Sequence, residues 1–370
     1  MLKSTEVLKQ KKRFDGIDNT TLDFFPDAPK VEFLHNAIID PERCLCLDEN
    51  YQPTKSSLRD YIGIYDENSR NWIRSSKRVV DNGVTPQAIK QEKEIRELAS
   101  YEYINNILFN KPIISLPDDK LYIKLISNHH NTYGHIFEDV FTKLRSINVD
   151  EILKLNKRIC FLLTKGDDVK DFDKWFYALL PIKEYDTIFI SYRDKNLYFV
   201  PHVLDIKQSS VHCNLSNIEE FNWLNEKMHK AFYKPDHPKT KLFLTRIPPL
   251  RRGILNHEEL HQKLKEIGVK ILTGKESLEE RYNAFYNATH ICGYHGATML
   301  HSYFSDENVR ILEYVPKGMP AKCCGNMYKK TDSFYIRPID TDKKLDVDLP
   351  IDEILEFFNS KKDEDFICFN

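Results

Sequence analysis

Arginine, histidine and carboxylate residues follow short apolar segments in the C-terminal half of this 370-residue sequence. The residues that come at or just after these segments are Arg246, Arg251, Arg252, Thr273, His295 and Glu313. Guanidinium groups bind phosphates through charge-assisted hydrogen bonds, and acidic residues accept hydrogen bonds from ribose hydroxyls in dinucleotide sites. Together these residue types predict a site for a ligand that carries a diphosphate and hydroxyl groups.

Two of the 12 glycines, Gly293 and Gly296, bracket the dipeptide Tyr294-His295. Glycine permits positive φ angles and a close approach of the backbone to a ligand. A helix expected to begin at 297 would add free N–H groups and a positive dipole end, both of which favour a phosphate. The predicted turn consists of Gly293, Tyr294, His295 and Gly296, and Ala297 and Thr298 begin the expected helix. It matches neither GxGxxG nor GxxxxGK[ST], so neither a dehydrogenase nor a P-loop is indicated.

Each of these residues, taken alone, has a simpler explanation. Arg251 and Arg252 are then solvated surface charges, Glu313 is a partner in a salt bridge, and His295 is a satisfied turn histidine. The positions relative to the expected strands favour a shared site, because parallel strands place their carboxyl ends at one edge of a sheet.

The C-terminal half has the periodicity of alternating strands and helices. Strands are predicted at 241–245, 269–272, 289–292 and 309–313, and helices at 256–267, 277–287 and 297–304. Asn256 and Ser277 are predicted N-caps, each with a glutamate three residues later, and Gly268 is the expected left-handed stop. Short connections in this order indicate a parallel, doubly wound sheet.

The N-terminal half is less regular but also suggests an α/β domain. Strands are predicted at 112–116, 121–126, 159–164 and 187–192, the last paired with 196–200 across a polar turn, and helices at 85–109, 135–144, from Asp168 and at 216–233. The expected organisation is a mobile arm at 1–25, an N-terminal domain at 26–233, a linker at 234–238 and a C-terminal domain at 239–350. A last helix within 351–370 is expected to return to the first domain.

Composition excludes several classes of protein. Fifty-four basic and 56 acidic residues give a net charge of -2, so no whole-chain field attracts nucleic acid. No apolar run reaches the ~18 residues of a membrane span and no signal segment is evident, so we expect a cytoplasmic protein. The eight cysteines lack CxxC spacing and are expected to be reduced thiols. No residue spacing indicates a zinc site, and the oligomeric state is left open.

Several motifs in the chain resemble glycosyltransferase family 61. The resemblance rests on the segments 242–246, 251–260, 277–280 and 292–297, together with Phe304 and the strand that ends at Glu313. Tyr133, His135 and Asp139 also resemble the N-terminal helix motif of that family. The family includes the plant core xylosyltransferase and the N-acetylglucosaminyltransferases that act on EGF domains and on O-mannose. One departure is that Thr298 and Met299 stand where the family usually has Gly-Leu.

The resemblance implies two Rossmann-like domains that face each other across a cleft, in a GT-B-like architecture of the α/β class. It implies an inverting hexosyl- or pentosyltransferase with a nucleotide-sugar donor, a UDP-sugar in our expectation, and a glycan acceptor, but no further cofactor. The expected donor-binding residues are Arg246, Arg251, Arg252, Asn256, Thr273, Gly293, Tyr294, His295, Gly296, Ala297, Thr298 and Glu313.

Inverting transfer needs a base for the acceptor hydroxyl. His135 and Asp139 lie four residues apart, so on a helix they share a face and Asp139 can orient the imidazole. The alternative is a structural histidine, with Glu138 as the next candidate for the base. The DxD pairs at 171–173 and 346–348 lie in a helix and a polar tail, so they do not indicate a metal site. A binding protein without turnover and a two-domain epimerase are the alternative functions.

Overall fold

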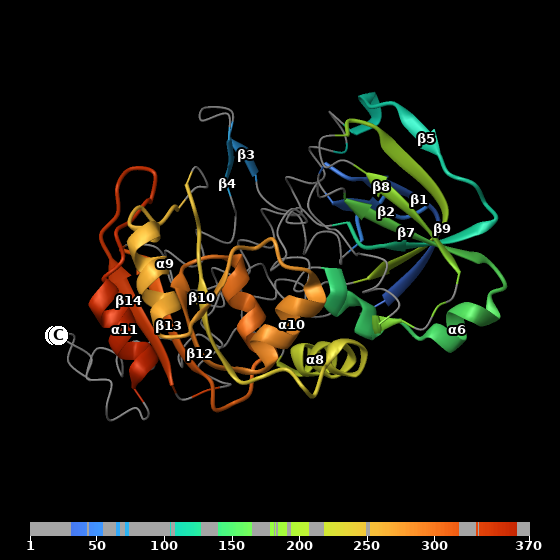
Figure 1. Ribbon diagram of the computed structural model, residues 1–370. Helices are drawn as coiled ribbons and strands as arrows, with labels where there is room; N and C mark the ends of the chain where they lie inside the picture. The colour runs from blue at the N-terminus through green and yellow to red at the C-terminus, as the bar shows by residue number, and fades with distance from the viewer. Residues whose placement is uncertain are drawn as a thin grey trace, which may run out of the picture. The chain divides into compact units, whose positions relative to one another are not determined.

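The computed structural model describes two compact units of the chain (Figure 1). The described residues are 31–42, 44–54, 64–66, 71–73, 104, 108–126, 140–164, 178–180, 182, 184–190, 194–206, 218–248, 252–317, 331 and 333–360. The division between the units falls between Leu224 and Asn225, within helix α8 (Ile218–Phe232). The predicted linker at 234–238 follows the end of this helix.

The C-terminal unit is built on a parallel five-stranded sheet. Its strands are β10 (Thr240–Leu244), β11 (Lys270–Leu272), β12 (Ala288–Tyr294), β13 (Arg310–Pro316) and β14 (Phe334–Ile339). The spatial order is β11-β10-β12-β13-β14, and every neighbouring pair is parallel. This is the 2-1-3-4-5 order of flavodoxin-like sheets, whose topological switch point lies between the first and third strands. Here that point lies between β10 and β12.

The first four of these strands confirm the predictions, whereas β14 was missed. Its sequence FYIRPI contains an arginine and a proline and shows no strict alternation of apolar and polar residues. Pro338 is tolerated because β14 is the last strand of the described sheet, where one side of the backbone has no neighbouring strand to bond.

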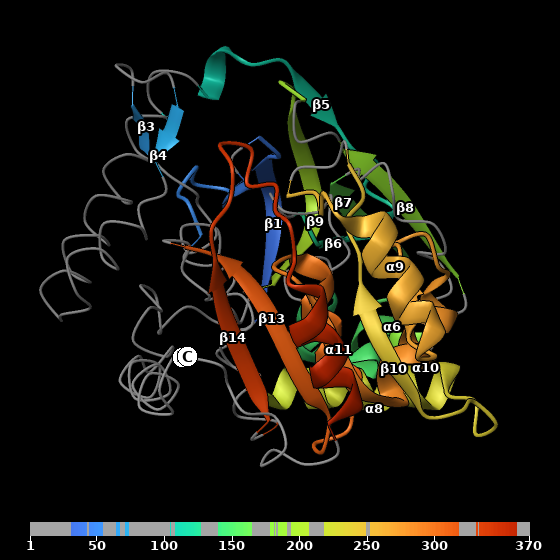
Figure 2. The same ribbon diagram turned by 60° about the vertical axis from the view of Figure 1, so that its left-hand side comes forward.

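Helices connect the strands of this sheet (Figure 2). The connecting helices are α9 (His257–Glu266), α10 (Leu278–Tyr286) and the 3₁₀ helix η5 (Ala297–Phe304), and α11 (Ile351–Asn359) follows β14. The capping box of α10 is confirmed, since the Glu280 N–H donates to Ser277 Oγ and the Ser277 N–H donates to the Glu280 carboxylate. Gly268 has a φ of +74° after α9, also as predicted.

The main core of the C-terminal unit lies where α9 and α11 pack on the sheet. Leu260 and Leu264 of α9 share one buried cluster with Phe357 and Phe358 of α11 and with Phe243 of β10. The helix α11 therefore contributes to the core of the C-terminal unit. The expected return of the 351–370 segment to the first domain stays a prediction.

The N-terminal unit contains a mixed sheet. Its strands are β1 (Val31–Asp40), β2 (Leu45–Leu47), β5 (Ile113–Ser115), β6 (Lys120–Lys124), β7 (Arg158–Thr164), β8 (Tyr185–Ile190) and β9 (Leu197–Ile206). The order is β2-β1-β9-β6-β7-β8, with β5 beside β9. The strands β5 to β9 run parallel where they pair, and β1 runs antiparallel to both β2 and β9. The α/β class is thus confirmed.

The predicted hairpin between 187–192 and 196–200 is wrong. The strands β8 and β9 are separated in the sheet by β6 and β7, and β8 pairs with β7 instead. Proximity in sequence and a polar turn favoured a hairpin, but β9 pairs with β1, β5 and β6 instead. The strand β1 was not predicted. Shorter described elements are β3 (Ile64–Asp66), paired with β4 (Asn71–Ile73), η2 (Leu108–Asn110), η4 (Thr142–Ser146) and α6 (Val149–Lys154).

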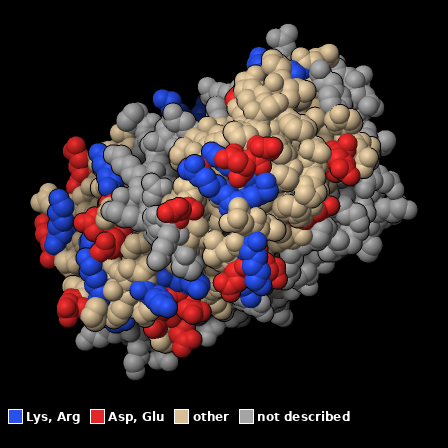
Figure 3. All heavy atoms as spheres, turned by 90° about the vertical axis from the view of Figure 1, so that its right-hand side faces the viewer, with Lys and Arg blue, Asp and Glu red and all other residues tan. Residues whose placement is uncertain are grey.

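Some predictions lie outside the described residues. These are the arm at 1–25, nearly all of the helix at 85–109, the start of the helix from Asp168, and the first part of the helix at 135–144. Among the described residues, no helix is long and apolar enough to cross a membrane. On the face drawn in Figure 3, basic side chains lie beside acidic ones, as the small net charge leads one to expect.

Candidate active site

Two arginines converge on one carbonyl group at the carboxyl edge of the parallel sheet. Arg246 follows β10 and donates a hydrogen bond from Nη1 to the carbonyl oxygen of His295, at 3.1 Å. Arg252 donates from its own Nη1 to the same oxygen, also at 3.1 Å. Because His295 follows β12, this contact lies at the switch point between β10 and β12. Two guanidinium groups thus lie side by side at the point where ligands of such sheets bind.

The loop that carries the arginines is folded back on itself. The Ile254 N–H donates to the Arg246 carbonyl at 2.8 Å, and the Gly253 N–H donates to Asp346 Oδ1 at 2.6 Å. Arg252, which directly precedes Gly253, has a φ of +65°, in the left-handed region. Asp346, which belonged to one of the fortuitous DxD pairs, therefore fixes the loop. No local sequence pattern predicts this contact, since Gly253 and Asp346 lie 93 positions apart.

Gly293 and Gly296 are needed for packing, which differs from the expected role. Gly296 has a φ of 178°, in the extended region open to any residue, but a Cβ atom there would lie 2.6 Å from Arg246 Nη1. At Gly293 a Cβ atom would lie 2.9 Å from Leu244 Cβ. The absence of a Cβ atom thus leaves room for Leu244 beside Gly293 and for Arg246 beside Gly296. The close approach at Gly296 is to the arginine of the site.

His295, whose carbonyl accepts from both arginines, forms a buried pair with Glu313. The distance from His295 Nδ1 to Glu313 Oε1 is 2.7 Å. Glu313 lies on β13, opposite Gly293 in the register of the sheet, and is completely buried. The expectation that Glu313 itself accepts from ribose hydroxyls does not fit this position, since its carboxylate contacts the histidine and lies below the surface.

Tyr294 and Asn256 have structural contacts in place of the expected ligand contacts. Tyr294 packs in the core below α9, and its hydroxyl donates to the Leu345 carbonyl at 2.7 Å. Burial raises the pKa of Tyr294 to about 12. Asn256 makes no side-chain cap on α9, because its amide group bonds to both the N–H and the carbonyl of Leu349.

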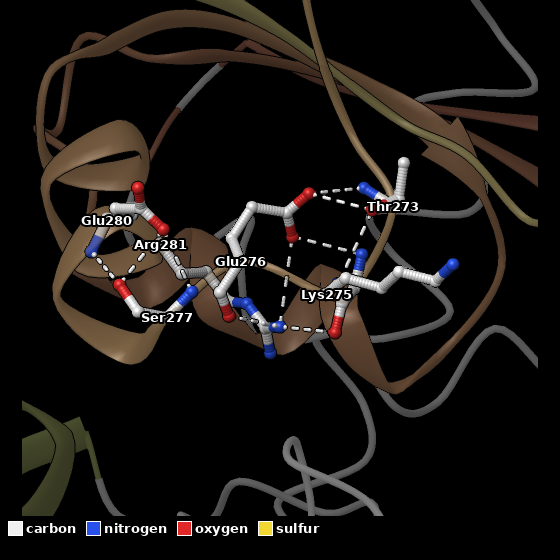
Figure 4. A network of polar contacts seen from close by, with 7 residues as sticks. Thr273, Lys275, Glu276, Ser277, Glu280 and Arg281 are labelled. Atoms are coloured by element: carbon white, nitrogen blue, oxygen red, sulfur yellow. Dashed lines mark hydrogen bonds and ion pairs between the residues drawn. The ribbon is translucent and has the colours of Figure 1, made fainter. Parts of the chain in front are cut away.

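Thr273 belongs to a closed network in the loop after β11 (Figure 4). The Glu276 carboxylate accepts hydrogen bonds from the Thr273 N–H at 2.6 Å and from the Gly274 N–H at 3.0 Å. It also accepts from Thr273 Oγ1, and Arg281 closes the loop by donating to the Gly274 carbonyl. The backbone donors that an anionic ligand would need are therefore taken by a carboxylate of the chain itself.

Five predicted site residues remain, namely Ala297, Thr298, Arg251, His135 and Asp139. The 3₁₀ helix η5 begins at Ala297, and Thr298 is half-buried within it. This confirms a helical segment after the turn, although it is a 3₁₀ helix. Arg251, His135 and Asp139 lie outside the described residues. Arg246, Arg252, His295 and Glu313 are members of the predicted set that the structure brings into direct contact.

Residues 133–312 match the family model of Glycosyltransferase 61. The chain carries a glycosyltransferase family 61 domain. A search of the curated proteins found no match. The family 61 match begins at Tyr133, two residues before His135, and it contains both arginines and His295. The resemblance seen in the sequence is thus confirmed, and the protein is a glycosyltransferase.

Proposed function

We propose that this family 61 protein is an inverting glycosyltransferase that moves a sugar from a nucleotide-sugar donor to a hydroxyl group of a glycan or glycoconjugate acceptor. The observation that carries the donor assignment is the convergence of Arg246 and Arg252 on the His295 carbonyl, at the switch point of the sheet. Nucleotides bind at this point in open α/β sheets. A UDP-sugar is our proposed donor.

The chemistry of the transfer explains why positive charge is placed there. In an inverting displacement, the acceptor oxygen forms a bond to the anomeric carbon while the bond to the nucleoside diphosphate breaks. Negative charge then builds up on the leaving diphosphate, and fixed cationic donors stabilise that charge. Arg246 and Arg252 are held in place by a shared carbonyl, so little reorganisation is needed when the leaving group departs.

The rest of the proposal concerns the acceptor side. We propose a GT-B-like pair of Rossmann-like domains, in which the C-terminal domain binds the donor and the N-terminal domain supplies the base. His135, oriented by Asp139, is the proposed base that accepts the proton of the acceptor hydroxyl. The family match begins just before this motif, which supports a role for it in the transferase.

Calorimetry with nucleotide sugars tests the donor site. UDP-, GDP-, CMP- and dTDP-sugars are screened first, and the tightest ligand is then titrated into the Arg246→Ala variant. Loss of a charge-assisted hydrogen bond costs roughly 1.5 to 3 kcal/mol, so donor affinity should fall by about one to two decades. Arg158→Ala removes an exposed guanidinium from β7 and is the control for charge alone. A folded Arg246→Ala protein with unchanged donor affinity would refute the assignment.

A transfer assay separates turnover from mere binding. The wild-type protein should release the nucleoside diphosphate from the selected donor, either by transfer to a glycan acceptor or by slow hydrolysis. Tight donor binding with neither reaction would instead indicate a binding protein of the same fold.

A further inference from the structure

The contact between Glu313 and His295 determines which ring nitrogen carries the proton. Glu313 is completely buried, and the His295 side chain is 5% exposed, so the pair is shielded from water. A carboxylate can only accept a hydrogen bond, and its Oε1 lies 2.7 Å from His295 Nδ1. The proton of a neutral imidazole therefore resides on Nδ1, and the lone pair resides on Nε2.

The second carboxylate oxygen of Glu313 indicates that burying this residue lowers the stability of the fold. Among the described residues, Glu313 Oε2 is buried and has no hydrogen-bond partner. A buried carboxylate that is only half satisfied reduces stability, and an apolar side chain of similar size would avoid that cost. A glutamate at this position, in contact with a histidine of the candidate site, is thus better explained by its effect on His295 than by stability.

We propose that Glu313 is a positioning residue that makes His295 Nε2 a hydrogen-bond acceptor for a hydroxyl group of the bound nucleotide sugar. This inference rests on the proposed donor site. A lone pair on Nε2 accepts from an O–H group but repels the oxygen atoms of a phosphate. The two arginines beside His295 supply the donors that a diphosphate needs. In this arrangement the arginines bind the diphosphate, and His295 Nε2 accepts a hydrogen bond from a hydroxyl group. That hydroxyl group belongs either to the ribose or to the transferred sugar.

The tautomer of His295 can be measured without any ligand. Long-range proton–nitrogen NMR spectra at about pH 8 distinguish the two neutral tautomers, and the His295→Phe variant assigns the signal. We expect the Nδ1–H tautomer in the wild type and in Glu313→Gln, whose amide oxygen still accepts from Nδ1. Glu313→Leu should lose this preference. A wild-type signal with the proton on Nε2 would overturn the inference.

Binding experiments then test the role of the acceptor nitrogen. The probes are inorganic pyrophosphate, the tightest of UDP, GDP, CDP and dTDP, and the glucose ester of that nucleotide. Glu313→Leu and His295→Phe should bind pyrophosphate within about twofold of the wild type. Both should bind a hydroxyl-bearing probe about tenfold more weakly, which corresponds to one hydrogen bond, whereas Glu313→Gln should stay close to the wild type.

The pattern of losses identifies the hydroxyl and separates the two proposals. A loss already present with the nucleoside diphosphate points to the ribose, and a loss only with the glucose ester points to the sugar. Equal affinities of wild type and His295→Phe for all probes would overturn the hydroxyl contact, while Arg246→Ala could still weaken pyrophosphate binding. If Arg246→Ala leaves pyrophosphate binding unchanged as well, the donor site itself is wrong, whatever tautomer His295 adopts.

Discussion

At the scale of single residues, the absence of a side chain at Gly296 leaves room for the guanidinium of Arg246. The guanidinium of Arg246 occupies the space in which a Cβ atom of residue 296 would lie. The glycine therefore acts on the candidate site through the arginine, and its backbone conformation is one that any residue can adopt.

We predict that Gly296→Ala weakens donor binding about tenfold with a small loss of stability, because the arginine must leave its carbonyl partner. Gly268→Ala is the matched control. Gly268 has a φ of +74° and open space around its Cβ position, so alanine there should cost about 1 kcal/mol of stability without changing donor affinity. Calorimetry and thermal unfolding of both variants check this. Equal donor affinities in the two variants would contradict the packing role of Gly296.

The site residues that the sequence predicted well are those at strand ends. The contacts of Arg246 and Arg252 with His295 confirm that these residues meet at one sheet edge. Asn256, Tyr294 and Thr273 contact Leu349, Leu345 and Glu276, and these partners are set by tertiary or loop geometry that the sequence pattern does not show. Their roles in donor binding stay predictions. A strand-end position specifies an edge of the sheet, but it does not specify which side chains face a ligand.

At the scale of elements, two local signals were read correctly, whereas the long-range pairing of β1 with β9 was missed. The capping box of α10 and the glycine after α9 depend on residues within one turn, so the sequence contains the whole signal. The antiparallel pairing of β1 with β9 joins residues more than 150 positions apart, such as Val31 and Ile206. Such pairings are selected by burial of the whole sheet, which no short pattern encodes.

The strand β6 offers an internal comparison of two lysines. At its end, Lys124 Nζ lies 2.8 Å from Asp205 Oδ1, and both side chains are 1% exposed. Thr54 Oγ1 donates to the other oxygen of Asp205 at 2.6 Å. Burial alone would raise the pKa of Asp205, but Lys124 and Thr54 outweigh it and hold this pKa below its usual value. At the start of the strand, Lys120 pairs with Asp186 at 2.8 Å near the surface.

We predict that Lys124→Met lowers the free energy of unfolding by about 3 to 5 kcal/mol, because it leaves the buried charge of Asp205 without its cation. Lys120→Met, four residues away on the same strand, should cost only about 0 to 1 kcal/mol because its partner is still solvated. Urea unfolding of the two variants provides the comparison. Similar losses of stability would show that the Lys124 pair is no better shielded than the surface pair.

At the scale of the whole molecule, the charges are nearly balanced and the candidate site depends on a local concentration of arginines. The chain carries 54 basic and 56 acidic residues, yet two guanidinium groups share one carbonyl at the carboxyl edge of β10 and β12. In the proposed mechanism, these fixed cations of the chain compensate the charge of the leaving diphosphate.

We therefore predict that transfer does not require a divalent cation. Excess EDTA should leave most of the activity, since Arg246 and Arg252 stabilise the charge that a metal ion would otherwise compensate. The assay compares initial rates with EDTA and with added manganese. A loss of activity that manganese restores would mean that the arginines are insufficient.

The proposed function depends most directly on where the donor binds, and a crystal structure with the selected nucleoside diphosphate measures that position. We predict that a diphosphate oxygen lies within about 3.2 Å of an Arg246 or Arg252 nitrogen, at the carboxyl edge between β10 and β12. A well-ordered diphosphate more than about 8 Å from both guanidinium groups would contradict the account, because that distance exceeds even a water-mediated hydrogen bond.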